Sequence, residues 1–158
     1  MSYFLAEQAE LTDDYGDSIS DAGNINVDSS VSGELETVGD YDLFAIELVS
    51  GFTYEFTAEC NSLSDPYLAI FDDDGQAIAF NDDTDNSLNS QIIFEAFSSG
   101  THYLEVSEAD DEGTGSYLLR ATLLGENEGN NDLLDSDNDG FVDGITNYQI
   151  WTASGGST

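Results

Sequence analysis

A strict two-residue alternation of apolar and polar side chains runs from Phe52 to Cys60. The apolar positions include Tyr54, Phe56 and Ala58, and a Thr or Glu stands between each neighbouring pair. This pattern does not line one face of a helix, because residues that share a helical face lie three or four positions apart. It is typical of a β-strand with one face on a core and the other in water.

The same kind of short apolar segment recurs along the chain, separated by turn-forming residues. No segment shows a helical period, and eight or nine short strands with frequent turns predict an all-β fold, an antiparallel β-sandwich. Pro66 is acceptable as the first residue of its strand. The other expected strands are residues 31–36, 41–49, 67–71, 77–80, 91–97, 102–106 and 116–124.

Changes in composition divide the chain into three parts. Residues 1–11 form an N-terminal arm, either a short helix or an ordered extended segment. Residues 12–124 carry the strand pattern and form the sandwich. Residues 125–158 begin with a Gly/Asn/Glu linker, continue into an acidic loop, and end in a Gly/Ser-rich tail that can belong to a neighbouring domain. We expect a monomeric module that contacts neighbouring domains of the same chain.

The charge of the chain excludes several classes of partner. It has 34 Asp and Glu residues against a single Lys or Arg, for a net charge of −33. Nucleic-acid binding needs a basic surface, so we expect no nucleic-acid partner. No apolar run approaches the roughly 18 residues of a membrane-spanning helix, so membrane insertion is not expected. A secreted, extracellular or bacterial cell-surface location suits this charge, and a halophilic cytosol is the alternative.

Acidic residues also gather in clusters, which a merely solvated surface does not explain. Carboxylates placed side by side repel one another, and closely spaced oxygen ligands are what Ca²⁺ prefers. One cluster lies in the acidic C-terminal part. There, Gly140 supplies the turn of a calcium loop, while Thr146 replaces the bidentate Glu of an EF-hand. The stretch resembles a thrombospondin type 3 or bacterial acidic repeat, and a solvated linker is the alternative. Its candidate ligands are Asp135, Asp137, Asp139, the Phe141 carbonyl and Asp143.

A second cluster of candidate calcium ligands surrounds the expected hairpin at residues 67–80. The hairpin can bring the loop after Phe80 back toward Asp65. The alternative is that Asp72 and Asp74 bond to turn amides and that the loop is simply polar. The candidate ligands and their acidic neighbour are Asp65, Asp72, Asn81, Asp82, Asp83, Asp85 and Asn89.

Nothing in the pattern favours catalysis. His102 and Cys60 both fall within expected strands, and we expect a structural histidine and a buried, inert cysteine. The motifs Gly-x-Ser-x-Gly and His-Glu-x-x-His are absent from the sequence. Arg120 is expected to form an ion pair with one of the many carboxylates. We therefore expect a protein that is not an enzyme.

From Leu11 to Leu124 the chain carries, in order, the motifs Asp14-Tyr-Gly-Asp17-Ser-Ile, Val38-Gly-Asp40-Tyr-Asp42-Leu-Phe44, Asp65-Pro-Tyr-Leu-Ala-Ile-Phe-Asp72, Gly75, Asn81-Asp-Asp83, Asn89-Ser90, Gly100-Thr-His-Tyr103 and Gly113-Thr-Gly-Ser-Tyr117. This series resembles the bacterial pre-peptidase C-terminal domain, which is similar to the collagen-binding domains of collagenases. The resemblance implies a jelly-roll-like β-sandwich attached to a secreted protease or a large adhesin. No collagen-contact motif is matched, so collagen binding is not carried over.

The resemblance also implies a calcium site between an acidic N-terminal linker and an acidic turn before a core strand. The linker of the collagen-binding relatives is not reproduced residue for residue. The expected function is a non-catalytic calcium-binding module of a large secreted bacterial protein, with an adhesin of the repeats-in-toxin kind as the favoured parent. It would bind a peptide, protein or glycan surface ligand in a calcium-dependent way. The alternative is a calcium-stiffened spacer or accessory domain of a secreted protease that binds no ligand. By position, the implied calcium ligands are Asp13, Asp14, Asp17, Asp40 and Asp42.

Overall fold

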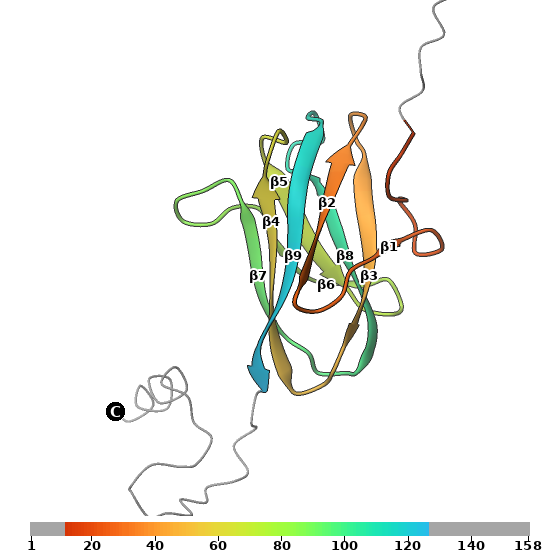
Figure 1. The fold of residues 1–158 in the computed structure, drawn as a ribbon, viewed down its shortest axis with the longest axis vertical. Helices are drawn as coiled ribbons and strands as arrows, with labels where there is room; N and C mark the ends of the chain where they lie inside the picture. Colours follow the sequence, from red (N-terminus) through yellow and green to blue (C-terminus); the bar gives the residue numbers. More distant parts are fainter. Residues whose placement is uncertain (1–11, 127–158) are drawn as a thin grey trace, which may run out of the picture.

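A computed structural model of the protein describes residues 12–126, which form two β-sheets packed face to face (Figure 1). Within this range there is no helix, and so none that could cross a membrane. The all-β sandwich expected from the sequence is confirmed. The strands are β1 Gly23–Asn24, β2 Ser29–Leu35, β3 Tyr41–Leu48, β4 Phe52–Cys60, β5 Pro66–Phe71, β6 Ala77–Asn81, β7 Ser90–Glu95, β8 Gly100–Glu108 and β9 Gly115–Glu126.

The alternation of β4 points its apolar side chains into the space between the sheets. Tyr54, Phe56 and Ala58 are buried, while the Thr and Glu residues between them are only partly covered. Phe44 of β3 and Leu104 of β8 face them from the other sheet. Burying one such large side chain contributes about 1.5–3 kcal/mol, so this two-sided layer is the main source of stability.

The last strand of the described residues, β9, lies in the middle of its sheet. The four-stranded sheet has the order β2-β9-β4-β7, and β9 pairs antiparallel with both of its neighbours (Figure 1). The strand continues to Glu126, two residues beyond Leu124, because Gly125 and Glu126 pair with Thr53 and Phe52 of β4. This extension could not be predicted from composition, since Gly and Glu match the linker expected from residue 125 onward.

The five-stranded sheet has the order β1-β3-β8-β5-β6, and its β3 edge is covered by the N-terminal segment. β1 runs parallel to β3, with Gly23 opposite Phe44. Upstream, the Leu43 amide donates a hydrogen bond of 3.2 Å to the Gly16 carbonyl. The ring of Tyr15 packs on Phe44 at a centroid distance of 4.5 Å. The segment therefore satisfies a strand edge that would otherwise be open to pairing with another chain.

Candidate metal centre

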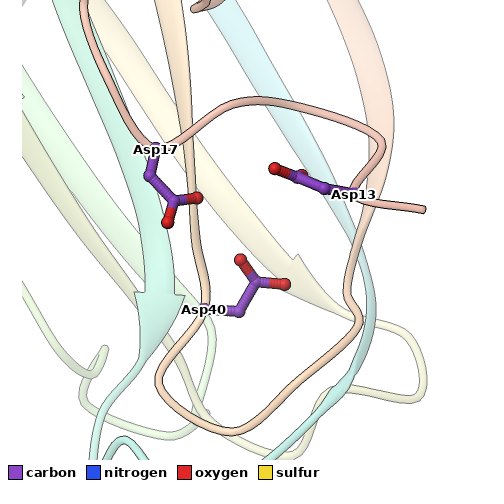
Figure 2. Close-up of side chains that lie close together, drawn as sticks. All are labelled: Asp13, Asp17 and Asp40. Atoms are coloured by element: carbon purple, nitrogen blue, oxygen red, sulfur yellow. The ribbon is translucent and has the colours of Figure 1, made fainter. Parts of the chain in front are cut away.

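Three carboxylates from two separate parts of the chain converge beside the start of β3 (Figure 2). Asp13 and Asp17 belong to the N-terminal segment, and Asp40 lies in the turn between β2 and β3. One oxygen from each lies within 4.8 Å of the others. The docking of the N-terminal segment on β3 brings these residues together, as the family resemblance implied.

A second group overlaps the first through Asp13 and adds Asp14 and Glu36. Backbone amides hold its carboxylates in place. The Asp14 amide donates to Glu36 Oε1 at 2.9 Å, and the Glu34 amide donates to Asp14 Oδ2 at 3.2 Å. The Glu36 amide donates to Asp40 Oδ2 at 2.7 Å. Each of these three bonds uses one oxygen of a carboxylate, so its second oxygen remains available. We call Asp13, Asp14, Asp17, Glu36 and Asp40 the acidic cluster.

Glu36 is the member of the acidic cluster that sequence reasoning missed. Its Oε2 is buried and has no hydrogen-bond partner among the described residues. Burial first, and then its contact with Asp40, raises the pKa of Glu36 to about 7. The alternation in this strand placed Glu36 with Glu34 on the solvent face. Its position at the end of β2, next to the acidic turn, was the available signal.

Asp42 lies behind the acidic cluster, in the interior of the sandwich. It is 0% exposed, and Tyr117 of β9 donates a hydrogen bond to its Oδ2. Its Oδ1 is buried with no hydrogen-bond partner in the described part of the chain. Burial raises the pKa of Asp42 to about 8, in spite of the bond from Tyr117. Asp42 thus belongs to neither metal-ligand group, although Asp14, Asp40 and Glu36 all act on its charge.

No cationic side chain neutralises the acidic cluster. The only Lys or Arg in the sequence is Arg120, which confirms its expected role by pairing with Glu59 at 2.8 Å on the four-stranded sheet. Burial and then repulsion from Asp40 and Asp13 raise the pKa of Asp17. An oxygen-only donor set with several free oxygens and uncompensated charge fits a hard divalent cation. These acidic groups can hold a metal ion.

The structure also brings together part of the cluster expected around the β5–β6 hairpin. Oxygens of Asp65, Asp82 and Asp83 lie within 4.8 Å of one another. Asp65 Oδ1 is buried and has no partner among residues 12–126. Burial first, and then Asp82 and Asp83, raise the pKa of Asp65. The loop after Phe80 thus returns to Asp65, as the hairpin geometry predicted.

Other residues of that expected cluster have structural partners. Asp72 Oδ1 accepts hydrogen bonds from the amides of Asp74 at 3.1 Å and Gln76 at 2.8 Å, which shapes the hairpin turn. The side-chain oxygens of Asn81 and Asn89 accept bonds from the amides of Gln91 at 3.0 Å and Cys60 at 2.8 Å.

Asp85 does not belong to the group formed by Asp65, Asp82 and Asp83. It lines an open hollow of about 390 Å³ together with Asn81 and Asp83. Of this cluster, then, only Asp65, Asp82 and Asp83 lie in mutual ligand range.

The candidate ligands of the acidic C-terminal loop cannot be placed in the structure. Asp135, Asp137, Asp139, Phe141 and Asp143 lie outside the described residues, so the acidic loop stays a prediction.

His102 is buried in β8, with Nδ1 3.1 Å from the Gly100 carbonyl and its ring edge on Phe94. The expectation of a buried Cys60 is wrong, because this residue ends β4 and is exposed at the rim of the sandwich. The alternation assigned its face correctly but could not show where the neighbouring sheet stops covering it.

Comparison with known proteins supports the fold. No family model matches the sequence, and no curated protein matches it. Among solved structures, the chain is similar to the pre-peptidase C-terminal domain of a collagenase from Bacillus anthracis, with a TM-score of 0.54 and 20% identity over 64% of this chain and 94% of that one.

Two periplasmic inhibitors of g-type lysozyme are also similar. The one from Aeromonas hydrophila has a TM-score of 0.41 and 18% identity over 65% of this chain and 96% of its own. The one from Salmonella Typhimurium has a TM-score of 0.39 and 18% identity over 63% and 98%. The chain therefore shares its β-sandwich fold with the pre-peptidase C-terminal domain of the Bacillus collagenase.

Proposed function

We propose that this protein is a non-catalytic, calcium-binding accessory module of a larger secreted protein. The observation that carries the proposal is the convergence of Asp13, Asp17 and Asp40 from two parts of the chain, with no cationic side chain beside them. Calcium would neutralise this charge and join the N-terminal segment to the β2–β3 turn. The remaining shell can draw on Asp14 and on the buried, unpartnered Oε2 of Glu36.

Two further calcium positions belong to the proposal. Asp65, Asp82 and Asp83 offer the second, and the buried Oδ1 of Asp65 without a partner within the described residues supports it. The acidic loop that begins at Asp135 and ends at Asp143 is the third, on the spacing of its carboxylates alone. Asp42 lies behind the first position, and its charge adds to the attraction for the ion where its carboxyl is deprotonated.

The test is thermal unfolding in EDTA and in millimolar Ca²⁺ at matched ionic strength. Extracellular calcium modules bind with dissociation constants of roughly 10⁻⁴–10⁻³ M. At about 10 mM Ca²⁺, which is roughly 100 times the tighter of these constants, one site adds roughly 2.7 kcal/mol to the free energy of unfolding. The double variant Asp13→Asn with Asp40→Asn should lose most of this gain. Asp73→Asn, at an exposed hairpin position, is the matched control and should keep it.

A midpoint that does not change with Ca²⁺ in the wild type would remove calcium from the proposal. Equal calcium responses in the double variant and the Asp73→Asn control would move the ion away from the acidic cluster. Tb³⁺ luminescence sensitised by a nearby tyrosine gives an independent readout of occupancy.

The parent is proposed to be an adhesin, with a secreted protease as the alternative, and the location extracellular or on the bacterial cell surface. The net charge of −33 and the fold shared with a collagenase domain support this setting. The module would present a peptide, protein or glycan ligand-binding surface, whereas a spacer would bind nothing. Screening peptide and glycan arrays in Ca²⁺ and in EDTA separates the two, since a spacer gives no calcium-dependent signal in either array.

A further inference from the structure

Glu105 occupies an unusual place in the five-stranded sheet. Leu104 and Val106 on either side of it point into the core, so Glu105 faces outward from β8, the strand between β3 and β5. Its direct cross-strand neighbours are Leu43 on β3 and Ala69 on β5, which are both buried and apolar. A carboxylate therefore stands in the middle of an apolar sheet face.

This carboxylate lacks a partner within the described part of the chain. No cation lies beside it, and no hydrogen bond acts on its charge. Burial first, and then the charge of Asp111, raises its pKa. A half-buried carboxylate without a counter-charge is costly, since burial penalises the charged form. The sequence cannot supply a side-chain cation from elsewhere, because its only Lys or Arg is the Arg120 already bonded to Glu59.

Aromatic rings surround Glu105 and form an open pocket of about 220 Å³. Tyr103 precedes it by two residues on the same face of β8, and Phe71 lies directly opposite Tyr103 on β5. Tyr41 of β3 adds a third ring, which is 37% exposed. Aromatic faces attract cations, and a carboxylate beside them supplies the matching charge.

The remaining wall of the pocket comes from Ile19 of the N-terminal segment and from Gly75 in the β5–β6 turn. A Cβ on Gly75 would lie 3.2 Å from Ile19 Cδ1, so the two elements are in close contact there. Asp17 also lines the pocket and brings a second carboxylate. The pocket is thus lined by apolar side chains, aromatic rings and carboxylates, and no cationic side chain of the described residues lines it.

The geometry points to a docking site for a guanidinium group: Tyr41, Phe71 and Tyr103 stack on an arginine side chain of a partner protein, and Glu105 accepts its hydrogen bonds. A guanidinium is planar, stacks on aromatic rings and bonds a carboxylate with two parallel N–H groups, which an ammonium does not do. The net charge of −33 draws basic segments toward this surface. This inference specifies the class of ligand for the binding module proposed above, and it rests on that proposed function.

The experiment is a titration of the calcium-loaded protein with the acetylated, amidated peptide Gly-Gly-Arg-Gly-Gly, followed by NMR. We expect saturable shifts centred on Tyr41, Phe71, Tyr103 and Glu105. The citrulline peptide, which keeps the shape and loses the charge, should not bind. The lysine peptide should bind at least about fivefold more weakly, because it lacks the planar fork.

Two variants with a matched control test the residues. Glu105→Gln should weaken binding at least about tenfold, because it removes a largely desolvated charge pair. Glu47→Gln removes the same charge from an exposed position on the same sheet and should change affinity less than about twofold. Tyr103→Leu, which keeps an apolar side chain and loses the ring, should weaken binding as Glu105→Gln does.

Several results would overturn this assignment. One is an equal affinity of the Glu105→Gln and Glu47→Gln proteins for the arginine peptide. Another is binding of the citrulline or lysine peptide as tightly as the arginine peptide. A third is a set of NMR shifts spread over the whole surface of the protein. Failure of the arginine peptide to bind a protein that calcium still stabilises would overturn the site while the calcium proposal stands. Binding of the arginine peptide to a protein that calcium does not stabilise would support the arginine site and overturn the calcium proposal.

Discussion

Gly33 leaves room for a hydrogen bond that joins the two sheets. Tyr117 of β9 donates this bond to Asp42 of β3, and a Cβ on Gly33 would overlap the Tyr117 hydroxyl and lie 3.0 Å from Asp42 Oδ2. The bond gives a fully buried carboxylate its partner, so the absence of a side chain at Gly33 is a packing requirement. An alternating strand pattern does not reveal this requirement, because it says nothing about the strand across the core.

We expect Gly33→Ala to lower the free energy of unfolding by about 1–3 kcal/mol, the usual range for overpacking a filled interior. Urea unfolding followed by fluorescence measures the change. Ser32→Ala, one residue earlier on the exposed face of the same strand, is the control and should stay within about 0.5 kcal/mol of the wild type. A Gly33→Ala protein as stable as that control would show that the Tyr117–Asp42 bond tolerates displacement.

At the scale of whole elements, the N-terminal segment joins the acidic cluster to the edge of β3. Asp13 and Asp17 flank Tyr15 in the sequence, and the ring of Tyr15 packs on Phe44. The Gly16 carbonyl accepts a hydrogen bond from the Leu43 amide. Any ion held by the acidic cluster therefore also holds this segment against the sheet. Without the ion, the mutual repulsion of the carboxylates works against the same contact.

Calcium is accordingly expected to slow hydrogen exchange at the Leu43 amide much more than at the amides of β4. Local opening of the N-terminal segment exposes Leu43, whereas the β4 amides exchange only through larger openings of the sheet. Exchange measured by NMR in EDTA and in Ca²⁺ checks this expectation. A uniform change across β3 and β4 would mean that the ion acts on global stability and not on the segment.

The limits of sequence reasoning also appear element by element. Eight strands could be predicted because their patterns, an alternation as in Phe52–Cys60 or a short apolar run as in residues 67–71, are local. β1 could not, because Gly23 and Asn24 carry no pattern and become a strand only by lying parallel to Phe44 and Ala45. Likewise, the acidic residues were visible as clusters. Which of them meet depends on contacts between residues 13–17 and 36–40, so Glu36 was missed. Asp72 was predicted as a ligand with turn formation as the alternative, and its Oδ1 accepts amide hydrogen bonds in the hairpin turn.

Over the whole molecule, the raised carboxylate pKa values predict opposite pH responses with and without calcium. Glu36 and Asp42 have pKa values of about 7 and about 8 in the folded protein, above their ordinary values of 4.5 and 3.8. Between these limits the folded state binds more protons than the unfolded state, so in EDTA the free energy of unfolding falls as pH rises. Calcium needs deprotonated ligands, so its contribution grows as pH rises.

Melting temperatures measured from about pH 5 to about pH 8 in EDTA and in Ca²⁺ test this expectation. The gap between the two curves should widen with pH. Asp42→Asn should flatten the EDTA curve, because it removes a carboxyl group whose pKa burial raises to about 8 in the folded protein. A melting temperature that rises with pH in EDTA would contradict the sign argued here.

The central position of β9 decides when the chain can fold during its synthesis. β9 is the last strand of residues 12–126, yet it lies between β2 and β4, and Ser29 pairs with Ala121. When only the first eight strands have left the ribosome, the four-stranded sheet still lacks β9, the strand that pairs with both β2 and β4. Contacts between residues so far apart form slowly, because the long loop between them must close first. The sandwich of residues 12–126 therefore cannot be completed before the chain has left the ribosome as far as Glu126.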